Sequence, residues 1–114
     1  MNSPVYTIDI AHPGRHPERA EEELCDAWQT VRTSPALRIL KVIHGYGSSG
    51  QGGSTRTLAR NWGFSQRARF RAIINGEDYT LFDGTTQQMR QETGAYDDPD
   101  LAHGNAGILV IWVK

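Results

Sequence analysis

The sequence predicts an α/β fold, a two-layer sandwich built on a four-stranded mixed sheet. Segments with the apolar spacing of strands alternate along the chain with segments that have the spacing of amphipathic helices. The order is strand, helix, strand, helix, strand, short helix, strand, which implies two right-handed crossovers with helices over the sheet. The composition, 38% hydrophobic and 22% charged residues, is that of an ordinary globular protein. A length of 114 residues suits one hydrophobic core, so we expect a single domain over residues 1–114.

The first half of the chain predicts a strand, a helix and a second strand. Residues 5–10 alternate apolar and polar side chains and are rich in β-branched and aromatic types, as strands are. Pro17 suits the first turn of a helix whose apolar residues recur at helical spacing as far as Val31. The sequence Thr-Ser-Pro at residues 33–35 ends that helix. Residues 37–43 are apolar enough for an interior strand.

The second half predicts a glycine-rich loop and the remaining elements. Residues 45–53 contain five glycines, and the serine that follows can cap a helix running through Trp62, which Gly63 can end. A short helix around residues 87–91, begun by Asp83 or Thr85, precedes an irregular acidic loop and a buried closing strand; these last two are expected at residues 96–105 and 107–113.

The charges are unevenly distributed, although the formal net charge is only −1. Residues 27–76 contain no acidic side chain and eight basic ones, whereas the segment after them is acidic. Strand spacing would place Arg67, Arg69 and Arg71 on one face of a third strand, opposite apolar side chains. These arginines are either a solvated strand face or, because like charges in a row repel, a surface that binds an anion such as a phosphate backbone.

The sequence also excludes several classes of protein. The longest apolar run, Ile108–Val113, has six residues, whereas a membrane-spanning helix needs about 20. The first residues lack the basic and apolar pattern of a signal peptide. Cys25 is the only cysteine, which excludes an internal disulfide and a thiolate zinc site. We therefore expect a cytoplasmic protein with no membrane partner.

The glycine-rich loop is the strongest sign of a binding site. Glycines let backbone amides approach a phosphate, and the N-terminus of the following helix adds favourable potential. No lysine precedes Ser54, so the loop is not a nucleoside-triphosphate loop. Tyr46 projects from it and is expected either to stack on a base or to pack against the loop. The alternative is a surface loop without function.

Asp9 and His44 are predicted to lie together, because both fall near the carboxyl ends of parallel strands. His44 is a candidate general acid or base, and Asp9 is a candidate to orient it, to act as a base or to hold a metal ion. The alternatives are a structural histidine and an aspartate paired with an arginine. We expect the loop amides and the three arginines to converge with these residues on one pocket for a sugar-phosphate chain.

The chain resembles the Smr (small MutS-related) domain family. The resemblance rests on three motifs in order: residues 8–11 (Ile-Asp-Ile-Ala), residues 44–47 (His-Gly-Tyr-Gly) and the glycine-rich entry to the last strand at residues 104–108. It spans nearly the whole chain. It implies a fold similar to the C-terminal domain of translation initiation factor three, and a DNA-nicking or RNA endonuclease activity in several members.

The resemblance assigns roles to individual residues. It implies that Asp9 and His44 take part in cleavage and that Gly45 and Gly47 lie where the backbone approaches the nucleic acid. The chain departs from the pattern at Ala11, where the family has histidine; His12 follows one residue later and would reach the site only if a turn began there.

Two functions follow from these observations. The first is an endonuclease with Asp9, His44 and His12 as catalytic residues, and Mg²⁺ or Mn²⁺ as a possible cofactor. The second is a non-catalytic module that binds nucleic acid or the ribosome. A protein adaptor with an acidic docking segment at residues 77–100 is a third, weaker alternative. The sequence leaves open DNA or RNA, and the oligomeric state.

Overall fold

The computed structural model describes residues 3–45, 50–102 and 104–114, and the side chains of these residues other than 50–54 and 102. None of the described helices is long and apolar enough to cross a membrane. The elements follow one another in the order β1 (Val5–Asp9), α1 (Pro17–Thr33), β2 (Ile39–Ile43), α2 (Gly50–Ser65), η1 (Arg67–Arg69), β3 (Phe70–Asn75), η2 (Gly76–Asp78), α3 (Gly84–Thr93), η3 (Pro99–Ala102) and β4 (Ile108–Val113), where η marks a 3₁₀ helix.

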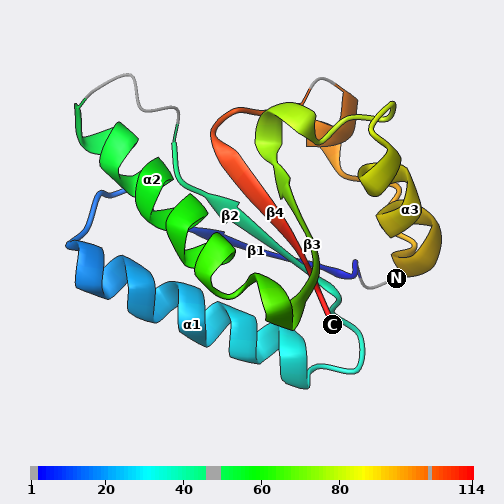
Figure 1. Cartoon of the computed structure of the whole chain (residues 1–114), viewed down its shortest axis with the longest axis horizontal. Helices are drawn as coiled ribbons and strands as arrows, with labels where there is room; N and C mark the ends of the chain where they lie inside the picture. The colour runs from blue at the N-terminus through cyan, green and yellow to red at the C-terminus, as the bar shows by residue number, and fades with distance from the viewer. Residues whose placement is uncertain (1–2, 46–49, 103) are drawn as a thin grey trace.

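The four strands form one mixed sheet in the order β1-β2-β4-β3 (Figure 1). β1 is parallel to β2, and β4 is antiparallel to both β2 and β3. β1, β2 and β3 therefore all run in the same direction and end at the same edge of the sheet. The expected α/β class, mixed sheet and element order are confirmed.

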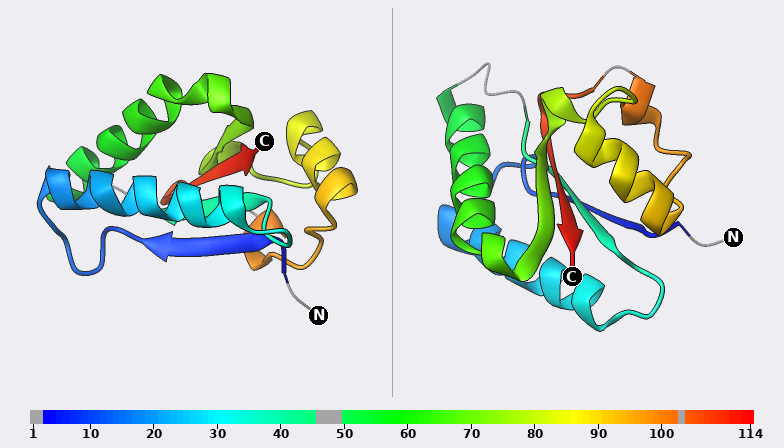
Figure 2. Two further views of the ribbon diagram at one scale, coloured as in Figure 1. Left: turned by 90° about the horizontal axis from the view of Figure 1, so that it is seen from below. Right: turned by 45° about the vertical axis from the view of Figure 1, so that its right-hand side comes forward.

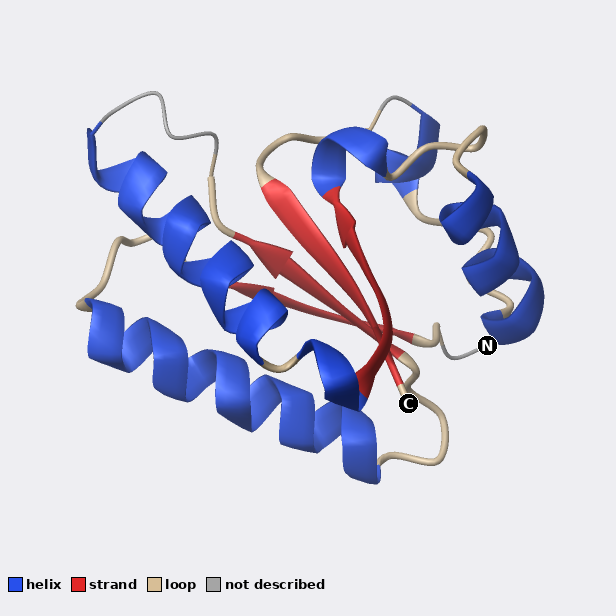
Figure 3. Ribbon diagram, in the orientation of Figure 1, coloured by secondary structure: helices blue, strands red, loops and turns tan. Residues whose placement is uncertain are grey.

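Helices cover both faces of the sheet (Figures 2 and 3). α1 and α2 lie on one face, where Leu24, Trp28 and Trp62 belong to the larger apolar cluster. α3 and the segments around it cover the other face, with Tyr79 and Met89 in a second cluster. All six residues of β4 are buried as a consequence. The two layers formed by the sheet and by α1 and α2 are thus joined by a third, smaller layer, which α3 and its neighbouring segments form on the other face of the sheet.

The ends of the helices follow from local sequence. Pro17 occupies the first turn of α1, as expected. The Asp83 carboxylate caps α3 by accepting a hydrogen bond from the Thr86 amide at 2.9 Å. Gly94, at φ +77°, ends α3 in the left-handed conformation that glycine adopts without strain.

Two expectations about the middle of the chain are wrong. Gly63 does not end α2; it lies where the helix packs on the sheet, and a Cβ there would stand 3.4 Å from the Leu109 side chain. The third strand begins at Phe70 rather than at Arg67, because residues 67–69 form a 3₁₀ turn after the helix. Phe70 is the first residue of the strand to enter the core, where its ring lies against Trp28 and Trp62.

An ionic cluster lies buried on the α3 face. Lys41, on the interior strand β2, is 7% exposed, and its Nζ pairs with Asp98 at 2.8 Å and also with Asp100. The Tyr79 hydroxyl, fully buried, donates a hydrogen bond to the second oxygen of Asp98. The acidic segment expected to be an irregular loop therefore supplies counter-ions to a buried lysine.

Candidate functional site

Three turns meet where the parallel strands end, and we call this region the carboxyl edge. Asp9 closes β1, His44 and Gly45 follow β2, and η2 follows β3. The turns after β1 and β2 touch: the position of a Cβ on Gly45 would lie 3.6 Å from the Ala11 Cβ. Sites on open α/β sheets lie at such edges.

Asp9 and His12 are in direct contact. The Nδ1 of His12 lies 3.0 Å from Oδ2 and 3.2 Å from Oδ1 of Asp9. Oδ1 also accepts hydrogen bonds from the amides of Ala11 and His12, at 2.8 and 3.0 Å. The chain thus turns just after the strand. Because Ala11 stands where the family has histidine, His12 could reach the site only through such a turn, and the turn brings its ring to the Asp9 carboxylate. The His12 side chain is 69% exposed.

The environment keeps Asp9 charged and in place. Partial burial acts to raise the pKa of its carboxyl, but the hydrogen bonds from Ala11 and His12 outweigh burial and lower that pKa below its ordinary value. Arg15 donates from Nη1 to the Asp9 carbonyl oxygen at 2.8 Å and pairs through Nε with Glu23 at 3.0 Å. Arg15 therefore ties the turn to α1.

His44 is fully buried. Its Nδ1 lies 2.8 Å from the Gly45 carbonyl oxygen, and its Nε2 has no hydrogen-bond partner among the described residues. Burial is the main cause that lowers the pKa of His44. The backbone of Gly45 and Ile108 acts to raise that pKa, and the nearby Arg60 and Arg56 lower it further. The fold therefore favours the neutral form of the His44 imidazole.

Gly45 has the backbone conformation that its residue type allows. Its φ is +83°, which disfavours any side chain. Its amide, however, donates to the Gly107 carbonyl oxygen at 3.1 Å, as the His44 amide does at 2.9 Å. The Gly45 amide is thus used within the fold. Tyr46 and Gly47, the other expected loop contacts, lie outside the described residues.

Asp9 and His44 share the carboxyl edge, but no hydrogen bond or ion pair between them is among the described contacts. Asp9 pairs with Ile43 in the sheet register, one residue before His44. Side chains alternate between the two faces of a strand. Asp9 falls on the face of Val5, which packs with the α3 cluster, whereas His44 falls on the face of Val42, which packs with α1 and α2. The carboxylate engages His12 instead of His44.

Sequence reasoning missed two arginines at this edge. Arg56 and Arg60, one turn apart on α2, both reach Glu77 of η2, at 3.2 and 2.6 Å. Partial burial acts to raise the pKa of the Glu77 carboxyl, but a hydrogen bond from its own backbone amide and the two guanidinium groups together lower that pKa. The spacing of four residues on a predicted helix was the available signal.

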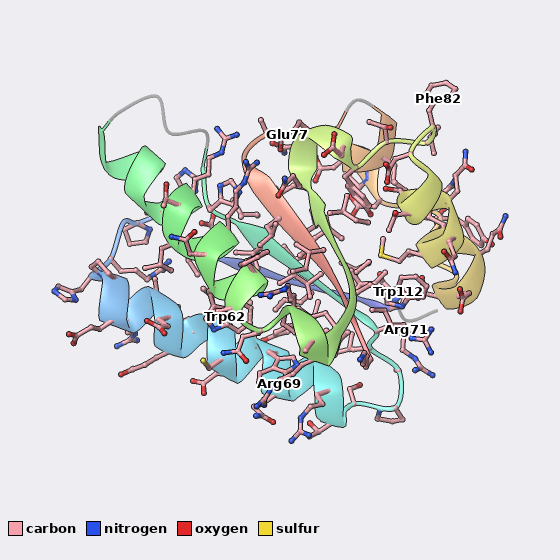
Figure 4. All side chains as sticks on the ribbon, viewed as in Figure 1. Trp62, Arg69, Arg71, Glu77, Phe82 and Trp112 are labelled. Carbon is pink, nitrogen blue, oxygen red and sulfur yellow. The ribbon has the colours of Figure 1, made fainter. Side chains whose placement is uncertain are left out.

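The prediction that Arg67, Arg69 and Arg71 lie on one face of a strand is wrong. Arg67 and Arg69 lie on η1, before the strand. Arg69 lies over the ring of Trp28, in the α1 and α2 core, whereas Arg71 lies over Trp112 of the other core. Phe70 pairs with Val113, at the end of the sheet opposite the carboxyl edge, and Figure 4 shows Arg69 and Glu77 at opposite ends of β3.

The expected single pocket is therefore not formed, because the three arginines do not reach the carboxyl edge. Metal binding has no assembled ligand set either: the described residues contain no group of three or more His, Cys, Asp or Glu side chains placed to hold an ion. What the described part of the edge does contain is an exposed carboxylate–imidazole pair, a buried histidine and two arginines bound to one carboxylate.

No protein-family model and no curated protein matches the sequence. Among solved structures, the chain is similar to the crystal structure of the Smr domain of Thermus thermophilus MutS2. The two share 17% sequence identity, the match covers 96% of each chain, and the TM-score is 0.53. The chain therefore has the fold of an Smr domain, as its motifs indicated.

Proposed function

We propose that the protein binds the phosphate backbone of a nucleic acid at the carboxyl edge and cleaves a phosphodiester bond there. The exposed Asp9–His12 pair carries the proposal. The Smr-domain fold supports a nucleic-acid partner, since the resemblance to that family implies DNA nicking or RNA cleavage in several of its members. The proposal covers both DNA and RNA as substrates.

The Asp9–His12 pair suits general acid–base catalysis. Asp9 fixes Nδ1 of His12, which leaves Nε2 to exchange a proton with bound substrate. As a base, His12 removes a proton from the attacking hydroxyl while its oxygen bonds to phosphorus and the bond from phosphorus to the leaving oxygen breaks. The protonated His12 then returns that proton to the leaving oxygen, directly or through water, which regenerates the neutral imidazole. Such assistance contributes about 10²–10⁴-fold to a rate.

Arg56 and Arg60 supply positive charge at the same edge. Guanidinium groups match the geometry of phosphate oxygens, and such groups stabilise charge that develops in phosphoryl transfer. In the free protein both contact Glu77. A phosphate that displaced Glu77 would find two cations already in position.

The test is cleavage of supercoiled plasmid, structured RNA and single strands by the wild type and by His12→Ala, with Mg²⁺, with Mn²⁺ and with a chelator. We expect the variant to lose about 10²-fold or more in cleavage rate while it keeps its affinity. Asp9→Asn should lose a similar factor, because the ring loses its orienting charge. Equal cleavage by wild type and His12→Ala would refute the catalytic role.

A non-catalytic binding module is the second candidate. It is favoured by the burial of His44 and by the use of the Gly45 amide within the fold, since both residues were expected to face the substrate. This candidate predicts that the wild type binds nucleic acid and leaves every substrate of the panel intact under all ionic conditions.

A further inference from the structure

We infer that the protein has a second phosphate-binding surface, at the end of the sheet opposite the carboxyl edge. This inference rests on the proposed function and extends it to a separate part of the molecule. We call the surface the basic end; it consists of the exposed residues Arg32, Arg38, Arg67, Arg69 and Lys114.

The topology brings these cations together from four parts of the chain. α1 ends here, β2 and β3 begin here and β4 ends here (Figure 1). The Val113 amide donates to the Arg38 carbonyl oxygen at 3.0 Å, and Phe70 pairs with Val113. Lys114 Nζ donates to the Ala68 carbonyl oxygen at 2.8 Å, between the two arginines of η1.

The basic end differs from the other charged surfaces because its cations are largely free of carboxylates. Elsewhere, Arg15, Lys41, Arg56 and Arg60 all pair with acidic side chains. At the basic end, none of the five cations takes part in an ion pair among the described residues; Arg71, which pairs with Glu92 at 3.7 Å, lies on the α3 face instead. The positive charge is therefore not neutralised within the described part of the chain.

Aromatic rings and backbone or amide oxygens hold these cations in place. Arg32 and Arg69 both lie against the Trp28 ring, at 5.8 and 5.3 Å from its centre. Arg67 lies 4.0 Å from the centre of the Phe64 ring and donates to the Phe64 carbonyl oxygen. Stacking orders a guanidinium group and leaves its charge intact. Ordered, uncompensated guanidinium groups are suited to bind phosphate.

The composition of the surface favours a nucleic acid over an acidic protein. Protein interfaces centre on buried apolar and aromatic side chains, whereas the residues that define the basic end are all cations. Nucleic-acid interfaces are polar and strongly positive. Phe64, 63% exposed beneath Arg67, adds a ring on which a base can stack.

The two surfaces are separated by the length of a strand. β3 has six residues, which span about 20 Å. A duplex of about six base pairs covers that distance. A ligand longer than this can reach both surfaces, so affinity should rise with duplex length beyond about six base pairs.

The test uses the full chain and fluorescent duplex DNA and duplex RNA, with the dissociation constant measured across a series of salt concentrations. Arg69→Gln and Lys114→Gln should each reduce the slope of log K against log salt by about 0.9, and Arg32→Gln/Arg69→Gln by about 1.8. Arg19→Gln is the matched control, because Arg19 is exposed on the first half of α1. It should keep the wild-type slope.

Lys114→Gln also guards against misfolding, since Lys114 is exposed and contacts no core ring. Wild-type affinity and slope in all the basic-end variants, with weakened binding by Arg56→Gln/Arg60→Gln, would overturn this inference and leave the proposed function standing. Weakened binding by the basic-end variants alone would support the inference and refute binding at the carboxyl edge. No binding by the wild type would overturn both.

Discussion

The Oε1 oxygen of Glu77 lies 2.6 Å from Nη2 of Arg60, and its other oxygen binds Arg56. One carboxylate thus occupies two guanidinium groups beside the buried His44. An anionic ligand at the carboxyl edge must compete with this carboxylate, so Glu77 is expected to weaken phosphate binding.

Glu77→Gln should therefore bind nucleic acid more tightly. Loss of the carboxylate frees Arg56 and Arg60, which should steepen the slope of log K against log salt by about 1–2. Asp78→Asn is the control. It also removes one negative charge, one residue further along the chain, but Asp78 contacts no arginine among the described ion pairs. Equal affinities of the two variants would show that Glu77 acts only through net charge.

Gly76→Ala should destabilise the fold strongly. A Cβ at Gly76 would lie 1.7 Å from the Asn105 carbonyl oxygen and 2.6 Å from that of Ile108, so the backbone must move. We expect a loss of about 3 kcal/mol or more in the free energy of unfolding, measured by urea denaturation. Gly84→Ala is the control, because nothing lies within 4 Å of its Cβ position; it should be neutral or slightly stabilising.

His44 should make the stability depend on pH. Its pKa is lowered in the folded protein from an ordinary value of 6.5, so the unfolded chain binds a proton more readily. The free energy of unfolding should consequently be highest above pH 6.5 and fall as the pH drops below it. His44→Gln should lack this part of the fall in urea titrations between about pH 7.5 and 5. Parallel curves for the two proteins would contradict a buried neutral histidine.

Lys41→Met should be destabilising, because it leaves Asp98, with a side chain only 6% exposed, without its cation. We expect a loss of about 3–5 kcal/mol in the free energy of unfolding. Lys41→Met/Asp98→Leu also removes the more deeply buried of the two carboxylates that pair with Lys41, and it should recover part of that loss, although Asp100 still lacks its cation. Additive effects in the double variant would show that the two side chains do not interact.

Local patterns predicted the elements well. The apolar spacing of α1, the interior strand β2 and the Asp83 cap of α3 all depend on neighbours in the sequence, and the structure has them. The predicted start of β3 was wrong because the alternation of charged and apolar side chains extends back to Arg67, whereas the strand and its core contacts begin at Phe70. Alternation of side chains cannot show at which residue the preceding helical segment ends and the strand begins.

Contacts between distant residues were the part that the sequence did not predict. Lys41 and Asp98 are 57 residues apart, and each alone has the appearance of an ordinary surface charge. The Asp9–His12 contact was foreseen as an outcome of a turn at Ala11, because only three residues separate the two side chains. The expected meeting of Asp9 and His44 failed because adjacent strand ends do not fix the face on which each side chain lies.

The most direct test of the account is the salt dependence of nucleic-acid binding by the wild-type chain. We predict measurable binding at about 50 mM salt and a slope of log K against log salt of about −2 or steeper, since at least two arginines contact phosphate. Absence of binding at low salt, or an affinity that does not change with salt, would contradict it.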